Sequence, residues 1–203
     1  MNKYVKRYLV DGMGGMAQGL FASLLIGTII KTFGQLLLKL GNNAVFQFFV
    51  DAGNFACESH VVGAAMAISI GFALKSSGLV LFSLAAVGAT ANTLGGAGGP
   101  LAVLIIAIVA TELGSLVSKK TKVDILVTPL VTILSGALLA VLTAKWIGLG
   151  ASSVGKLIMW ATNLHPFIMG ILVSVIVGIV LTLPISSAAI SPSIACKRYK
   201  PFI

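Results

Sequence analysis

The chain has 203 residues, of which 58% are hydrophobic and 9% are charged, and its mean hydropathy is +1.07. About a quarter of the residues of an average soluble domain are charged, so this composition excludes a water-soluble globular fold. The few charged residues lie almost entirely between long apolar runs. This spacing predicts an all-α protein that crosses a membrane several times.

Four apolar runs are long enough to span a bilayer, because a helix needs about 20 mostly apolar residues to cross the hydrocarbon core. Each contains at most one full charge, and they lie at residues 16–38, 100–118, 125–144 and 166–185. Two shorter runs, at residues 61–74 and 79–94, are separated by Lys75-Ser76-Ser77-Gly78. The sequence therefore predicts about six membrane segments, with the two short runs forming a thin hairpin that spans or re-enters.

Lys and Arg residues predict the orientation, because cytoplasmic loops of membrane proteins are enriched in them. A cytoplasmic N-terminus places ten of the fourteen basic residues on that side, including Arg7, Lys75 and Lys120. An even number of crossings then returns the C-terminus to the cytoplasm. The net charge of +9 follows from this bias and from contact with anionic lipids, so we expect the bilayer as a partner and no nucleic acid.

Glycines end the second short run, since residues 95–99 contain four glycines and cannot hold a stable helix. Non-helical backbone at membrane depth is tolerated only where protein buries it or where it lines a watery cavity. In transporters, short and interrupted spans of this kind mark the substrate site. Asn92, Gly95 and Gly96 are therefore candidate substrate-binding residues. Close helix packing and a plain extracellular loop remain alternative interpretations.

Two segments combine polar and apolar residues. Residues 41–59 mix Asn, Gln, Asp and Glu with four phenylalanines, and residues 149–164 place Leu157, Trp160 and Leu164 on one helical face. Both are typical of interfacial helices, although either could bend inward as part of a substrate cavity.

Glu112 is the one acidic residue inside a long predicted span. An intramembrane carboxylate usually faces the protein interior or a watery path, which makes it a candidate functional group. Because Glu112 lies seven residues before Lys119, near the predicted cytoplasmic interface, a structural role is an equal alternative.

Further polar residues near predicted helix starts could hydrogen-bond the hydroxyl groups of a polar substrate, and their imidazoles could move protons. A histidine at a membrane interface is, alternatively, a solvated cap. These candidates are Glu58, His60, Asn163 and His165. The sequence contains no Walker P-loop, dinucleotide fingerprint or metal-ligand spacing, so we expect no cofactor, no metal and no catalytic residue in this chain.

Four segments carry a resemblance to a known family: YLVDGMGGMAQGLFASLLIGTI at residues 8–29, GGAGGP at 95–100, KVDILVTP at 122–129 and LPISSAAI at 183–190. Together they resemble the type 2 EIIC family of bacterial phosphotransferase systems, which includes toxin regulators of the perfringolysin-regulator type. The resemblance covers residues 5–190. It implies an EIIC-like transmembrane domain over residues 1–190, whereas residues 191–203 depart from the family pattern and are predicted, from their basic residues, to form a cytoplasmic tail.

The resemblance implies a sugar permease of the bacterial inner membrane, and the distribution of basic residues places its N-terminus in the cytoplasm. In such systems EIIC binds a sugar from outside and presents it to a phosphorylated cytoplasmic EIIB protein, itself served by EIIA. Phosphoryl transfer then belongs to EIIB. The family resemblance also suggests a homodimer. Related EIIC proteins place a glutamate and a histidine around the sugar, but their positions do not match this sequence residue by residue.

Family members of this kind look to be longer, so the basic tail resembles a truncation or a shifted reading frame. Two other functions remain open. The chain could be a membrane regulator or sensor without transport activity, which fits the truncated-looking C-terminal end and the cluster of basic cytoplasmic residues. It could also be an ion-coupled transporter, for which Glu112 is the deep acidic candidate.

Overall fold

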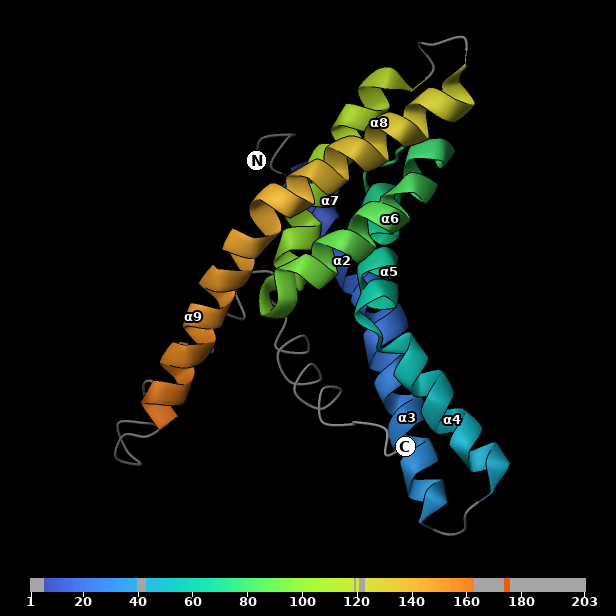
Figure 1. The fold of residues 1–203 in the computed structure, drawn as a ribbon, viewed down its shortest axis with the longest axis vertical. Coiled ribbons are helices and arrows are strands. Elements are labelled where there is room, and N and C mark those ends of the chain that lie inside the picture. Colours follow the sequence, from blue (N-terminus) through green and yellow to red (C-terminus); the bar gives the residue numbers. More distant parts are fainter. Residues whose placement is uncertain (1–5, 40–42, 119, 121–122, 163–173, 176–203) are drawn as a thin grey trace.

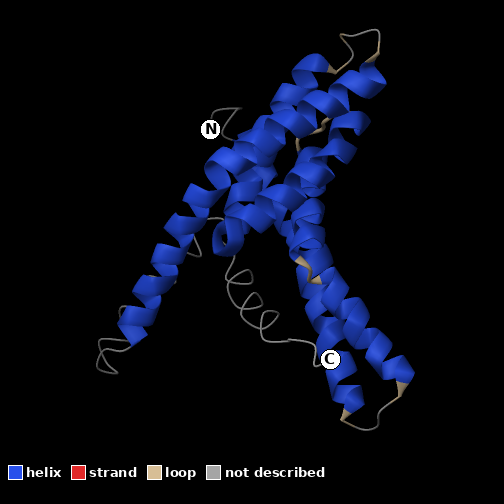
Figure 2. Cartoon of the chain, viewed as in Figure 1, coloured by secondary structure: helices blue, strands red, loops and turns tan. Residues whose placement is uncertain are grey.

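The computed structural model describes residues 6–39, 43–118, 120, 123–162 and 174–175, and every regular element within these ranges is a helix (Figures 1 and 2). Four of the described helices are long and apolar enough to cross a membrane, and a bent pair adds a fifth if it counts as one span. The prediction of an all-α, multi-pass membrane protein is confirmed. Of the run predicted at residues 166–185, the structure describes residues 174–175 alone.

The first candidate span, Arg7–Leu38, is one continuous helix of 32 residues. It comprises α2 (Gly12–Leu20) and α3 (Ile26–Leu38), with π-helical turns before and between them at Lys6–Asp11 and Phe21–Leu25. It starts earlier than the predicted run at 16–38 because Leu9 and Val10 extend the apolar surface. At about 1.5 Å per residue it measures about 48 Å, so it must tilt or project beyond a hydrocarbon core of about 30 Å.

The chain returns through α4 (Ala44–Ala56), which packs beside α3, and continues as α5 (Ser59–Ala73) after a bend of 56°. Figure 1 shows α3 and α4 side by side, extending away from the other helices. Glu58 has an extended backbone (φ −64°, ψ 138°), which interrupts the helix at this bend. The described part of the segment predicted at 41–59 as an interfacial helix therefore contains α4, the first half of a bent pair that fits either a broken span or a re-entrant loop.

The glycine run separates α6 (Gly78–Gly95) from α7 (Gly99–Val117) by a single 3₁₀ turn, Gly96–Gly98. Gly96 has φ +52°, a left-handed conformation that glycine adopts without steric cost. Pro100 follows in the first turn of α7, where its missing N–H has no helical partner to lose. The predicted helix break is confirmed, and α6 and α7 are both candidate spans. We call residues 95–99 the glycine break.

The last long helix among the described residues runs without interruption through α8 (Asp124–Leu139), a π-helical segment Ala140–Ala144 and α9 (Lys145–Thr162). The described part of the segment predicted as an interfacial helix at 149–164 thus continues the span predicted at 125–144. Contact with the glycine break explains why Gly148 does not end the helix: a Cβ on Gly148 would lie 2.5 Å from the Gly95 carbonyl oxygen. Close packing holds this part of α9 in place.

Helix α6 packs against α5, α7 and α8. At its crossing with α5, a Cβ on Gly63 or on Gly88 would collide with the carbonyl oxygen of the other glycine. Neighbouring Met66 and Leu84 are fully buried. Because lipid is as apolar as these side chains, such helices associate through close van der Waals contact rather than through hydrophobic burial. The packing interpretation of the glycines is thus confirmed at this crossing.

Candidate functional site

The predicted site residues that the structure describes fall near the two ends of α7. Gly99 begins this helix, and Glu112 lies thirteen residues later. At about 1.5 Å per residue this separates them by about 20 Å, which is farther than one sugar ring reaches. The structure therefore divides the predicted site into two groups of residues.

Asn92 organises the group at the glycine break. Its side chain is 7% exposed, and its Nδ2 donates hydrogen bonds to the Ser59 carbonyl oxygen (2.7 Å) and to Ser59 Oγ (3.1 Å). On the other side, Asn92 Oδ1 occupies the space that a Cβ on Gly99 would need. A buried amide must satisfy its hydrogen-bond donors. Asn92 does so by bonding from α6 to the beginning of α5, at a point where it also contacts the beginning of α7.

Ser59 lies between Glu58 and His60, and both of these neighbours are exposed. One turn after Asn92, Gly95 is buried and Gly96 is exposed. Five of the predicted site residues thus gather around the start of α5 and the glycine break: Glu58, His60, Asn92, Gly95 and Gly96. Asn163 and His165 lie outside the described residues and stay predictions.

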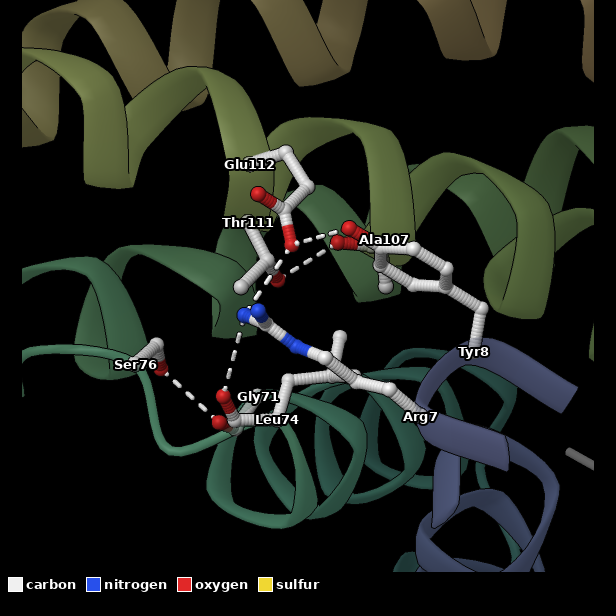
Figure 3. A network of polar contacts seen from close by, with 8 residues as sticks. All are labelled: Arg7, Tyr8, Gly71, Leu74, Ser76, Ala107, Thr111 and Glu112. Carbon is white, nitrogen blue, oxygen red and sulfur yellow. Dashed lines mark hydrogen bonds and ion pairs between the residues drawn. The ribbon is translucent and has the colours of Figure 1, made fainter. Parts of the chain in front are cut away.

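Glu112 lies in the second group, where it is paired with two residues of the N-terminal helix (Figure 3). Its Oε1 accepts a hydrogen bond from the Tyr8 hydroxyl at 3.0 Å and lies 3.1 Å from an Arg7 guanidinium nitrogen. The same nitrogen approaches the Leu74 carbonyl oxygen at the end of α5, at 3.5 Å. The Arg7 and Glu112 side chains are 46% and 37% exposed. The carboxylate is therefore partly exposed and has a counter-ion.

Sequence reasoning missed this pairing because it treated Arg7 as a marker of orientation. The available signal was a cation and a hydroxyl donor placed together, at Arg7 and Tyr8, just before an apolar helix. A carboxylate within a predicted span requires such partners, since an unpaired charge is costly there.

The turn after α5 and the end of α7 also meet at this end of the molecule, where Ser77 Oγ and Ser118 Oγ are 2.9 Å apart. Together with the Arg7 contacts, this bond joins the N-terminal helix, the turn after α5 and the end of α7. The positive-inside pattern assigned these three segments to one side of the membrane. The side of the membrane on which they lie stays a prediction.

Residues 10–197 of the chain match the model of the family "Phosphotransferase system, EIIC". No curated relative and no solved structure matches the chain. The matched range includes both the glycine break and Glu112. The predicted division of the chain at residue 190 stays a prediction. Because the family match extends over most of the sequence, this chain belongs to the EIIC family of the phosphotransferase system.

Proposed function

We propose that this EIIC chain binds a sugar and carries it across the membrane for phosphorylation by a cytoplasmic EIIB partner, which EIIA supplies with phosphoryl groups. The observation that carries the proposal is the family match over residues 10–197. Several apolar spans and a broken helix hairpin support it, because interrupted helices let a transporter present backbone groups to a substrate. A homodimer, the bacterial inner membrane and a cytoplasmic N-terminus belong to the same proposal.

We place the sugar at the glycine break rather than beside Glu112. The Glu58 carboxylate and the His60 imidazole are exposed and can exchange hydrogen bonds with hydroxyl groups. Gly96 is exposed in a left-handed conformation and offers backbone groups. Asn92 supports this arrangement from inside, since its side-chain nitrogen donates both to the Ser59 carbonyl oxygen and to Ser59 Oγ. Glu112 already has Arg7 and Tyr8 as partners, which also disfavours it as the proton carrier of an ion-coupled transporter.

The test is equilibrium binding of a panel of radiolabelled sugars to the purified protein. We expect Glu58→Gln or His60→Ala to weaken binding of the cognate sugar by about tenfold to 100-fold, since a hydrogen bond to a charged group contributes about 1.5–3 kcal/mol. Phe55→Ala, on an exposed apolar side chain of α4, is the matched surface control.

Two further variants locate the site. Loss of binding in Glu112→Gln, with binding retained in Glu58→Gln and His60→Ala, would move the sugar to the other end of α7. Loss in His165→Ala would add that residue to the site. If no sugar of the panel binds the folded protein, and deletion of its gene alters gene expression but not uptake, the protein is a regulator instead.

A further inference from the structure

The α3–α4 hairpin has an unusually close interface. A Cβ on Gly34 would lie 2.8 Å from the backbone nitrogen of Val50, and a Cβ on Gly27 would lie 2.9 Å from Cys57 Sγ. A Cβ on Gly53 would lie 2.5 Å from the backbone nitrogen of Lys31. These contacts give an antiparallel register, since residues later in α3 meet residues earlier in α4. The interface positions therefore define the two outer faces of the hairpin.

One outer face is polar on both helices. On α4, Asp51 and Asn54 each follow an interface residue, and Gln47 lies one turn before Asp51. The spacing of four and three residues places all three on one side of the helix. On α3, Gln35 follows the interface residue Gly34, and Lys31 lies one turn earlier. On both helices the polar residues are therefore rotated away from the interface in the same direction, toward the residue that follows each interface position.

The opposite outer face is apolar and aromatic. Phe33 precedes the interface residue Gly34, and Phe49 precedes Val50. Their rings meet edge to face with centroids 6.1 Å apart, and Phe48 packs against Phe49 at 5.9 Å. The residues that precede the interface thus share one side of the antiparallel pair. The residues that follow it, which are the polar ones, must share the other side.

The two faces suit different surroundings. Phe33 and Phe48 are 54% and 66% exposed, as expected for side chains that contact lipid. Gln35, Gln47 and Asp51 are also exposed, yet they belong to helices that are candidate spans. Gln47 Nε2 donates to Asp51 Oδ1 at 3.1 Å, which satisfies only part of their hydrogen-bonding capacity. Polar groups at membrane depth face protein or water rather than lipid.

The polar face leads toward the proposed sugar site. After Asn54, α4 ends at Ala56, and the chain reaches Glu58 and Ser59 within three residues. Ser59 holds Asn92 at the glycine break. Amide and carboxylate groups therefore continue from the hairpin to the site, and together they offer the mixed donors and acceptors that sugar hydroxyls require.

We propose that the polar face of the α3–α4 hairpin, formed by Lys31, Gln35, Gln47, Asp51 and Asn54, is one wall of the water-filled path along which the sugar reaches the glycine break. This inference rests on the proposed function for the identity of the occupant. The apolar face of the hairpin then meets lipid.

The test compares the two faces of the hairpin by thiol labelling. Cys57 and Cys196 are replaced by alanine and serine, and single cysteines are introduced as Gln47→Cys and Asn54→Cys on the polar face and as Phe33→Cys and Phe48→Cys on the aromatic face. Each folded variant is reconstituted in lipid nanodiscs, where a charged maleimide reaches both sides of the bilayer. Only a thiol in contact with water ionises and reacts.

We expect the two polar-face cysteines to react at least about tenfold faster than the two aromatic-face cysteines, and we expect bound sugar to slow only the polar-face pair. Equal rates on the two faces, or faster reaction at the aromatic positions, would overturn the proposal. So would unchanged rates when a sugar is shown to bind the same variants. If no sugar binds but the polar positions still react faster, the water-lined wall stands and the proposed sugar function fails.

Discussion

Gly88→Leu is expected to leave no folded protein in detergent, because even the first carbon of a side chain at this position has no space. A Cβ on Gly88 would collide with the Gly63 carbonyl oxygen and with the Ala67 side chain. Part of this obstruction is backbone, which cannot rotate away. Overpacking a well-packed site costs about 1–3 kcal/mol or more, and we expect Gly88→Ala to reach the upper part of that range. Thermal unfolding followed by size-exclusion chromatography measures the loss.

Gly14→Ala is the matched control, because a Cβ at that position of α2 meets nothing within 4 Å. Alanine is favoured over glycine in a helix by about 1 kcal/mol, so this variant should be neutral or slightly stabilised. Alanine should therefore lower the stability at Gly88 but not at Gly14. Equal melting temperatures for Gly88→Ala and Gly14→Ala would contradict the packing described for the α5–α6 crossing.

Charge reversal at Arg7 is the second large effect that we expect. Arg7→Glu places a carboxylate where a cation now lies 3.1 Å from Glu112. It removes the counter-ion, adds repulsion, and abolishes the bond from Arg7 to the end of α5. Because both side chains are more than a third exposed, the neutral variant Arg7→Gln should cost only about 1 kcal/mol or less. Arg7→Glu should therefore lower the melting temperature clearly more than Arg7→Gln does.

The exchange of the two charges tests whether the pair itself matters. In the double variant Arg7→Glu with Glu112→Arg, opposite charges face each other again, so we expect most of the lost stability to return. High salt should weaken both the loss and the recovery, since it screens partly exposed charges. If the stability loss of the double variant equals the sum of the losses of the two single variants, the residues are not coupled and the pairing is not a stabilising contact.

The sequence predicted the spans because each signal was local. Apolar length identified α6 and α7 almost to the residue, and four glycines in five positions predicted the break between them. Amphipathic periodicity also identified helices at α4 and α9. It could not show that α4 would pack on α3, or that α9 would continue α8, since both depend on contacts between distant segments. The contact of Gly148 with Gly95 is one of these.

The candidate site was less predictable for the same reason. Asn92 and the glycine break were identified from composition, but the bond from Asn92 to Ser59 joins residues 33 positions apart. Glu112 and Arg7 are separated by 105 positions, and no periodicity links them. Sequence reasoning therefore grouped Glu112 with the glycine break, whereas the structure separates them along α7.

The most direct test of the proposed function is sugar phosphorylation coupled to uptake. Membrane vesicles that contain this chain are loaded with phosphoenolpyruvate, the general phosphocarrier proteins, EIIA and EIIB, and are then given a panel of radiolabelled sugars from outside. We predict that one class of sugar appears inside as sugar phosphate, and only when both this chain and EIIB are present. Accumulation of free sugar that persists without the phosphocarrier proteins and collapses with an uncoupler would contradict the proposal and identify an ion-coupled transporter.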